Sequence, residues 1–410
     1  MKKFLAMILA LVMALSLVAC GKKDEPKTDD QNPGGDTNEV TYKIAMITDY
    51  GDITDQSFNQ TTYEACKAFA GANGVEFNYF KPAGDNTADR VAMIESAVDQ
   101  GYNVIVMPGY AFGGAIVEAA PEFPDVKFIA LDVAAGDLLE TAVAKAGEAY
   151  DYTPENWDLN KYVDMSNVYC AVYQEELCGY MAGYAAVKLG YKNLGFLGGM
   201  SVPAVVRYGY GFVQGVDAAA ADLGLTDVKL NYIYGGQFFG DADITAVMDT
   251  WYQGGTEVVF ACGGGIYTSA VDAAKKVNAK VIGVDVDQAG VIAKYAGVDG
   301  MTVTSAMKGL YPATYDTLTD VIVNGNWDKY VGKIATLGLV SGTDPEANYV
   351  QIPMGDGTQW SDSFTQDDYK AMVKDMFDGK ITVSNNTSSD VSAADFATVI
   401  TVDDQGSIKG

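Results

Sequence analysis

The sequence predicts an α/β protein with two lobes, each built on a doubly wound parallel sheet that helices cover on both faces. From residue 43 onward, short apolar strand-like runs alternate with helical segments, which is the pattern of repeated βα units. The roughly ten strand-like runs are many for one sheet. The alternation also breaks at residues 136–166, which are acidic and rich in turn residues. We therefore expect a boundary between two lobes there.

The individual elements follow from this alternation. The strand-like runs are 43–48, 75–80, 104–108, 127–132, 168–173, 193–198, 228–235, 257–262, 280–285 and 301–306. Helical segments separate them, for example 87–100, 174–189, 204–223 and 267–277. The tail predicts a helix at 310–323, a strand at 333–339 and a final helix at 364–377. Such a tail suits a chain that crosses repeatedly between two lobes.

The expected domain limits follow from these elements. The N-terminal lobe is assigned residues 41–166 plus 307–330, and the C-terminal lobe residues 167–306 plus 331–410. Hinge segments are expected near residues 166, 308 and 330. Residues 21–40 lack apolar periodicity and are rich in Asp, Pro, Gly and Asn, so they predict a flexible tether.

The first twenty residues predict a lipoprotein signal peptide. Lys2 and Lys3 form a charged start, residues 4–18 are apolar, and small residues lead to Cys20. This order resembles a bacterial lipobox, so we expect cleavage before Cys20 and lipid attachment to its thiol. The alternative is an ordinary secretory signal with a chance cysteine. With lipid attached to Cys20, the folded body would lie outside the cytoplasm, anchored to the bacterial cell membrane.

Charge and composition exclude several classes of function. The chain has 27 Lys and Arg against 54 Asp and Glu, a formal charge of −27, which disfavours nucleic acid as a partner. It has no His, so His-dependent triads and His-ligated zinc are excluded. The only arginines are Arg90 and Arg207, so a bidentate phosphate clamp is not expected, and Arg207 is expected on a helix surface.

Four cysteines follow Cys20, and they share no CxxC spacing. They are Cys66, Cys170, Cys178 and Cys262. All four fall inside predicted helices and strands. Buried free thiols are therefore favoured over a disulfide, although export would permit one.

Residues 43–60 predict a buried strand, an acidic turn and the start of a helix. Asp49 follows the strand, and Asp55 or Ser57 can cap the helix. Phe58 and Asn59 then lie in the first helical turn. In open α/β sheets, ligands bind in the crevice beyond the carboxyl ends of the strands, so this stretch is a candidate binding site.

The other predicted strands also end in residues suited to binding. They contribute two more aspartates, several glycines, aromatic side chains and one lysine. These residues include Asp132, Asp285, Gly263, Phe238, Phe239 and Lys308. Carboxylates at such a rim can accept hydrogen bonds from a neutral, hydroxyl-rich ligand, and flat rings can stack on a base or sugar. The alternatives are that the aspartates cap helices and that Phe58 or Phe239 belongs to the core.

Several motifs, in this order and spacing, resemble the basic membrane protein (Bmp) family of substrate-binding lipoproteins, which includes bacterial purine nucleoside receptors. They are DQSFNQ at 55–60, CGYMAG at 178–183, LGFLGGM at 194–200 with Pro203, GVDVDQ at 283–288 and TSAMK at 304–308. The resemblance spans roughly residues 42–330. It implies a type I periplasmic-binding fold, a purine nucleoside ligand and delivery of that ligand to an ABC permease.

The resemblance also implies roles for site residues. Asp49, Asp132, Asp285 and Lys308 would hold polar groups of the nucleoside, and Phe58 would stack on the base opposite Phe238 or Phe239. The ligand-binding set expected from strand ends and motifs together is Asp49, Tyr50, Phe58, Asn59, Asp132, Phe238, Phe239, Gly263, Asp285 and Lys308. This chain departs from the family pattern in two places. It has FFGDAD where the family has one phenylalanine followed by a GKE-like run. Its insert at 136–166 is also longer than the family's usual connection.

Two further hypotheses compete with nucleoside capture. One is a binding protein for a free sugar or another small polar metabolite. The other is an enzyme, such as a glycoside hydrolase that uses two rim aspartates. We expect a non-enzymatic monomer with no catalytic residue, cofactor or metal. Its membrane partner is either a permease or a signalling receptor.

Overall fold

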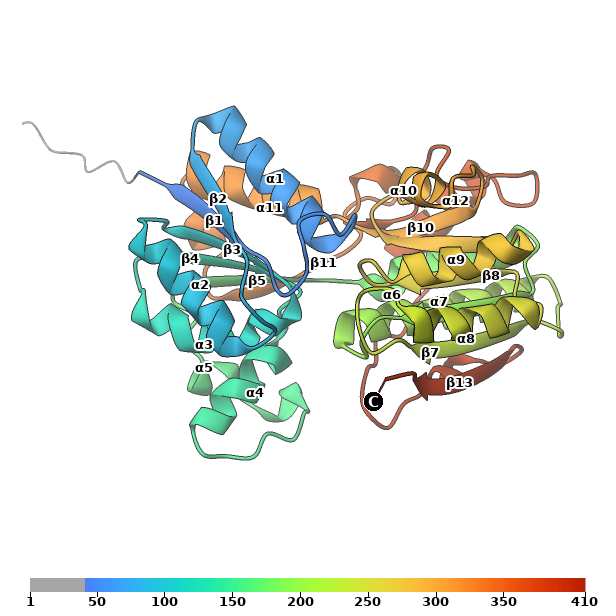
Figure 1. Cartoon of the computed structure of the whole chain (residues 1–410), viewed down its shortest axis with the longest axis horizontal. Coiled ribbons are helices and arrows are strands. Elements are labelled where there is room, and N and C mark those ends of the chain that lie inside the picture. Colours follow the sequence, from blue (N-terminus) through green and yellow to red (C-terminus); the bar gives the residue numbers. More distant parts are fainter. Residues whose placement is uncertain (1–40, 410) are drawn as a thin grey trace, which may run out of the picture. The chain divides into compact units, whose positions relative to one another are not determined.

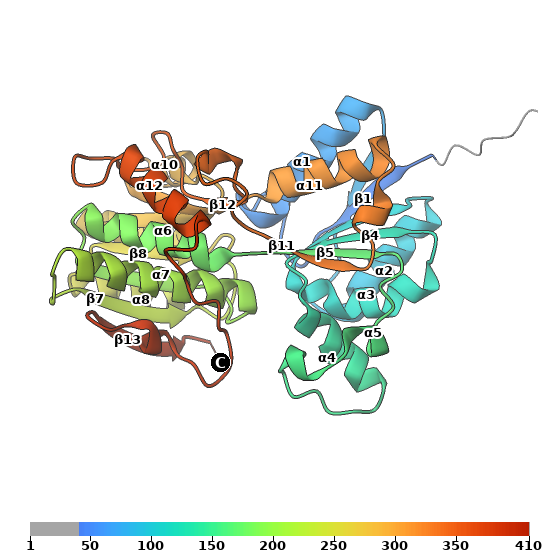
Figure 2. The same ribbon diagram turned by 180° about the vertical axis from the view of Figure 1, so that it is seen from behind.

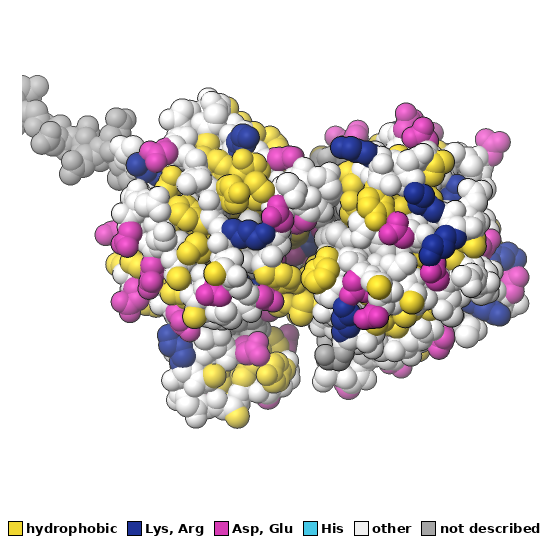
Figure 3. Space-filling model, viewed as in Figure 1, with side chains coloured by type: hydrophobic (Ala, Val, Ile, Leu, Met, Phe, Trp, Pro, Cys, Tyr) yellow, Lys and Arg dark blue, Asp and Glu magenta, His cyan; other side chains and the backbone are white. Residues whose placement is uncertain are grey.

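A computed structural model describes residues 41–409. Residues 1–40 and 410, which include Cys20 and the expected signal peptide and tether, lie outside the described residues. None of the described helices is long and apolar enough to cross a membrane. Acidic side chains are spread over the face of the molecule shown in Figure 3 and do not gather in one patch.

The first sheet has six parallel strands in the order β11-β5-β4-β3-β1-β2. Its strands are β1 (Lys43–Ile47), β2 (Glu76–Phe80), β3 (Val104–Pro108), β4 (Lys127–Leu131), β5 (Val168–Tyr173) and β11 (Lys333–Leu337). Its helices are α1 (Phe58–Asn73), α2 (Thr87–Asp99), α3 (Gly113–Ala119), α4 (Ala135–Lys145), α5 (Leu159–Tyr162) and α11 (Leu310–Leu318). In β1, Ile44 and Ala45 pack into different core clusters, so both faces of the sheet are covered (Figure 1).

The second sheet has seven strands in the order β12-β10-β9-β8-β6-β7-β13, parallel except at β12. Its strands are β6 (Asn193–Gly198), β7 (Lys229–Tyr234), β8 (Val258–Cys262), β9 (Lys280–Asp285), β10 (Thr302–Lys308), β12 (Val350–Gln351) and β13 (Thr401–Ser407). Its helices are α6 (Glu175–Lys188), α7 (Pro203–Asp222), α8 (Ala242–Gln253), α9 (Tyr267–Val277), α10 (Ala289–Ala296) and α12 (Gln366–Phe377). Both sheets therefore have a doubly wound core, as predicted, and the two cores share the same strand order. Figure 2 shows them from behind.

Sheet pairing corrects two of the expected lobe limits. Strands β5 and β11, which the sequence analysis assigned to the C-terminal lobe, pair with each other and belong to the first sheet. The acidic stretch 136–166 is an excursion of the first lobe that contains α4 and α5, and it does not mark the boundary. An apolar run such as 168–173 fits either sheet, so its own composition could not place it.

The chain crosses between the lobes at three points that bond to one another. These points lie between β5 and α6, between β10 and α11, and between β11 and β12. Gln174 N donates to Leu337 O at 2.9 Å, Gly309 N to Tyr349 O at 2.6 Å, and Tyr349 N to Gly338 O at 3.0 Å. One crossing lies at residues 308–309, where a hinge was expected, while the other two lie at Gln174 and at residues 338–349 and not near 166 and 330.

Helices α6 and α7 pack backbone against backbone. A Cβ added to Gly179 or Gly183 of α6, or to Gly211 or Gly215 of α7, would lie 2.1–2.4 Å from a carbonyl oxygen of the other helix. Only glycine permits this approach. The close pair brings the first turns of both helices to the same edge of the second lobe.

The structure confirms one chemical prediction and adds two strands. Cys66, Cys170, Cys178 and Cys262 are all free and buried, as expected. The short strand β12 and the terminal strand β13 were not predicted. β13 pairs in parallel with β7 and places its polar sequence TVDDQGS at the far edge of the second sheet.

Candidate functional site

The carboxyl ends of the strands surround a cavity of about 380 Å³ that residues of both lobes line. All ten residues expected to bind ligand line it: Asp49, Tyr50, Phe58, Asn59, Asp132, Phe238, Phe239, Gly263, Asp285 and Lys308. The residues expected from strand ends and motifs therefore lie together around one cavity. Their roles toward a ligand stay predictions.

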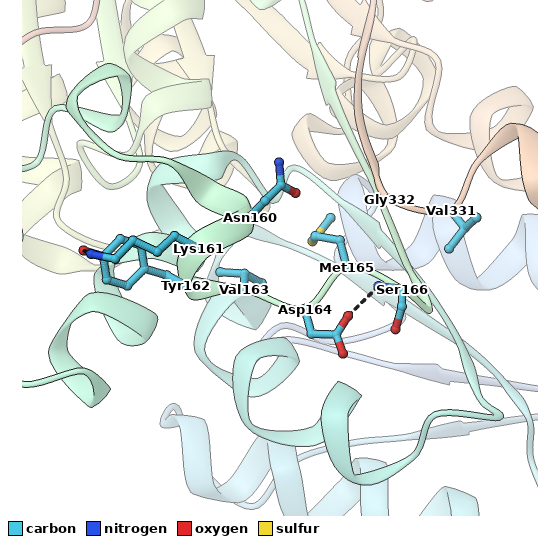
Figure 4. A pocket seen from close by; sticks show the side chains of 9 residues that line it. All are labelled: Asn160, Lys161, Tyr162, Val163, Asp164, Met165, Ser166, Val331 and Gly332. Atoms are coloured by element: carbon cyan, nitrogen blue, oxygen red, sulfur yellow. Dashed lines mark hydrogen bonds between the residues drawn. The ribbon is translucent and has the colours of Figure 1, made fainter.

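A second hollow, of about 680 Å³, lies on the first lobe at residues 160–166 and 331–332 (Figure 4). Sticks in that view show Asp164 accepting a hydrogen bond from the backbone of Ser166, at 2.9 Å. None of the ten expected site residues lines this hollow. The cavity at the strand ends is therefore the candidate site.

Lys308 is the charge centre of the cavity. Its Nζ lies 2.5 Å from Asp132 Oδ2, 3.5 Å from Glu175 Oε1 and 3.8 Å from Asp285 Oδ1, and its side chain is only 3% exposed. Burial alone would lower the pKa of Lys308, but the three carboxylates raise it above its ordinary value. Lys308 is therefore a permanent cation, and its Nζ also lies 4.6 Å from the centre of the Phe58 ring.

Asp132 and Asp285 lie at the carboxyl ends of corresponding strands, Asp132 directly after β4 and Asp285 as the last residue of β9. Both have left-handed backbone conformations, with φ of 59° and 64°. This conformation costs roughly 1–2 kcal/mol for most residues, and Asp is among those that tolerate it best. Retaining such strain at two matched strand ends indicates that the direction of these carboxylates matters.

Two buried acceptors of the cavity have no hydrogen-bond partner in the described part of the chain. They are Asp132 Oδ1 and Asn59 Oδ1. The other groups of the same turn are satisfied, since Asn59 Nδ2 donates to Asp49 and Asp55, at 3.2 and 3.1 Å. Buried acceptors without a donor are costly, so the cavity is suited to a ligand that supplies O–H or N–H groups.

Burial shapes the acidity of the cavity's carboxyl groups. It raises the pKa of Asp49 and of Asp285 above the ordinary range, although hydrogen bonds from Gly51 to Asp49 and the charge of Lys308 beside Asp285 oppose the rise. Burial likewise raises the pKa of Asp137, to about 7. The lining thus contains carboxyl groups that are poorer acids than exposed ones, and a neutral ligand would leave their protonation least disturbed.

The aromatic side chains differ in position. Phe58 lies under Lys308 and lines the cavity, so it is not a simple core residue. The Phe238 ring packs so closely on Gly199 and Gly263 that a Cβ added to either would lie within 2.6 Å of it. Packing of this ring therefore accounts for the two glycines, and no phosphate-binding loop is needed to explain them. The Phe239 side chain is 56% exposed. Phe238 is thus the more enclosed of the two rings.

Sequence reasoning missed Glu175 and misplaced Arg207. The expectation that Arg207 lies on a helix surface is wrong, because its Nε donates to Glu175 Oε2 at 2.6 Å and the residue lines the cavity. Glu175 in turn contacts Lys308. A helical position alone cannot reveal such a pair, because it depends on the close approach of α6 and α7.

The raised pKa of Asp137 makes a prediction about pH. Because the folded chain holds this proton more tightly than the unfolded chain, whose Asp titrates near 3.8, stability contributed by the neutral form is present at low pH and is lost between about pH 4 and 7. Replacing Asp137→Asn should therefore flatten the fall in the free energy of unfolding over this range. Denaturant titrations at pH 4.5, 6 and 8 would measure it, with exposed Asp299→Asn as control; equal pH slopes in both would contradict it.

Comparison with known proteins places the chain among solute-binding proteins. Residues 42–345 match the family model described as Bmp, ABC transporter substrate-binding protein PnrA-like. Relatives include the ABC transporter nucleoside-binding protein BmpA of Lactococcus lactis, 26% identical over 93% of this chain and 99% of the relative. An uncharacterized lipoprotein of Pyrococcus abyssi is 27% identical over 75% of this chain and 70% of its own length.

Solved structures agree on the fold. An ABC transporter solute-binding protein from Aeropyrum pernix has a TM-score of 0.59 at 20% identity and covers 84% of this chain and 88% of its own. Another from Conexibacter woesei has a TM-score of 0.58 at 20% identity, with 84% and 99% covered. The fold is therefore the type I periplasmic-binding fold that the sequence predicted.

Proposed function

The chain belongs to the Bmp family of PnrA-like ABC transporter substrate-binding proteins, and from this premise we propose that it captures a purine nucleoside of the inosine, guanosine and adenosine class. Family membership implies a small-molecule ligand and a permease that receives it. The relative from Lactococcus lactis that is named a nucleoside-binding protein supports the choice of ligand.

One observation carries this proposal: a single cavity combines enclosed aromatic rings with unsatisfied acceptors. The rings of Phe58 and Phe238 offer flat apolar faces to a base. Asp132, Asp285 and Lys308 offer acceptors and a donor to ribose hydroxyls. Asp49 and Asn59 lie in the same lining and would meet the edge of the base.

The remaining parts of the proposal concern the setting. We place the body outside the cytoplasm on a lipid attached to Cys20, and the name of the Pyrococcus abyssi relative as a lipoprotein supports this. The protein would act as a monomer, without catalysis, and would pass its ligand to an ABC permease.

Calorimetric titration with inosine, guanosine and adenosine tests the ligand. Binding of at least one is expected, and mass spectrometry of small molecules released from the purified protein should find the same class. Absence of heat with all three, together with heat from a free sugar such as ribose or glucose, would replace the nucleoside by a sugar. Release of free base and ribose during incubation would indicate an enzyme.

Asp285→Ala should weaken nucleoside binding by more than ~1.5 kcal/mol, the order expected when a hydrogen bond to a charged group is lost. The Asp285 carboxylate is buried in the cavity 3.8 Å from Lys308. In the alanine variant, water would therefore be a poor substitute for this hydrogen-bond acceptor. The same titration measures the change. Asp299→Ala, in an exposed loop of the same lobe, is the matched control, and equal affinities of the two variants would remove Asp285 from the site.

A further inference from the structure

Besides the bond from Lys308 to Asp132 in the cavity lining, two other hydrogen bonds that join the lobes involve buried residues outside that lining. Ser57 Oγ donates to Asp285 Oδ2 at 2.5 Å, and Gln288 Nε2 donates to Gln56 O at 3.1 Å. Ser57 and Gln288 are both fully buried, yet neither lines the cavity. They connect the lobes without being placed to touch a ligand.

The first of these bonds depends on how helix α1 is capped. Ser57 is at the N-cap position, where a serine hydroxyl ordinarily accepts from the helix's own amides. Here Asp55 does this, since its carboxylate accepts from the amides of Ser57, Asn59 and Gln60 at 2.9–3.1 Å. The Ser57 hydroxyl is thereby left to donate across the lobe boundary.

The second bond depends on two fixed partners. Gln288 is held inside the second lobe by two hydrogen bonds. Its side-chain Oε1 accepts from Val284 N at 3.0 Å, and its backbone N donates to Ser305 Oγ at 3.1 Å. Only its amide group Nε2 reaches the first lobe. On the other side, Gln56 has a left-handed backbone with φ of 58°, a strained conformation for this residue type.

We propose that Ser57 and Gln288 form a latch that sets the balance between closed and open lobes, and so tunes ligand affinity and release without ligand contact. Opening the lobes would expose both bonds to water and remove them. A ligand that needs the closed form binds in proportion to the population of that form.

Ser57 has a second effect, on the orientation of Asp285. Its hydroxyl binds Oδ2 of Asp285, and Oδ1 lies 3.4 Å from the Tyr208 hydroxyl and 3.8 Å from Lys308 Nζ.

The latch proposal rests on the proposed nucleoside function only in that a nucleoside serves as the ligand in the affinity measurement. With whichever of inosine, guanosine or adenosine binds the full-length chain, Ser57→Ala and Gln288→Met should each weaken affinity by about three- to tenfold, the equivalent of one net hydrogen bond. Stopped-flow measurement should locate the loss mainly in faster dissociation. A defect confined to Ser57→Ala would show that Ser57 only orients Asp285, and would overturn the latch.

Ser269→Ala is the matched control. Ser269 is equally buried, but its hydroxyl bonds Thr245 and Asp241 within the second lobe. Its loss should lower the melting temperature while leaving affinity and dissociation unchanged. If it slows or speeds dissociation as much as Ser57→Ala does, the effect is general loosening and the latch is overturned.

Small-angle scattering separates failure of the latch from failure of the nucleoside proposal. Without ligand, Ser57→Ala and Gln288→Met should have a larger radius of gyration than the wild type and the Ser269→Ala control. If the wild type binds none of the three nucleosides, the nucleoside proposal fails and this comparison alone decides the latch. Equal radii in all four chains would then overturn it.

Discussion

Lys308→Met should lower the free energy of unfolding by about 3–5 kcal/mol and abolish ligand binding, because removing one partner of a buried ion pair leaves an uncompensated charge. Here three carboxylates surround the lysine: Asp132, Glu175 and Asp285. Without Lys308, Arg207 is the cation that remains beside Glu175. The deficit should shrink toward acidic pH, because burial raises the pKa of Glu175 and of Asp285 and these two groups can then become neutral.

The matched control for this prediction is Lys192→Met. Lys192 also forms an ion pair, 3.0 Å from Asp227, but both side chains are largely exposed, so the same substitution should have little effect. Urea denaturation of both variants at pH 5 and 8 measures the difference. Equal stability of the two variants would show that the buried network is not needed for the fold.

Gly211→Ala should destabilise the chain by about 3 kcal/mol, the upper part of the range for overpacking. A Cβ at Gly211 would lie 2.1 Å from the carbonyl oxygen of Glu176, and backbone cannot swing aside as a long side chain can. Helices α6 and α7 must therefore separate. Since Glu175 and Arg207 lie near the N-terminal ends of these helices, ligand affinity should fall as well.

Gly71→Ala is the control for helix propensity. Gly71 lies in α1, is exposed and has no atom within 4 Å of an added Cβ. The substitution should be neutral or stabilising by roughly 0.5–1 kcal/mol, because alanine is the better helix former. Thermal melting of both variants tests the pair, and a Gly211→Ala chain that melts with the wild type would rule out the close packing of α6 on α7.

The sequence predicted which residues line the candidate cavity better than it predicted the ion pairs within it. Asp49, Asp132 and Asp285 could be found because parallel strands in one lobe all end at the same edge. Glu175 could not, because its importance depends on Lys308 and Arg207, 133 and 32 residues away. Contacts at such separations leave no local pattern of spacing or composition.

The lobe limits failed for a related reason. Composition shows where a chain leaves regular structure, as it does at 136–166, but strand pairing decides which sheet a strand joins. The apolar strand β5 carries no mark of its partners β4 and β11. The polar strand β13 was missed because its residues, including Asp403 and Asp404, have low strand propensity and gain their conformation from pairing with β7.

Strand β13 also has a consequence for how the protein resists aggregation at high concentration. Its neighbour β7 contains the apolar sequence YIY, and an open edge there would present unpaired backbone groups to any other extended chain. β13 occupies that edge with a strand whose own outer rim is exposed and carries aspartates, at 403 and 404. Like charges on two such rims repel, so edge-to-edge aggregation between neighbouring copies is opposed.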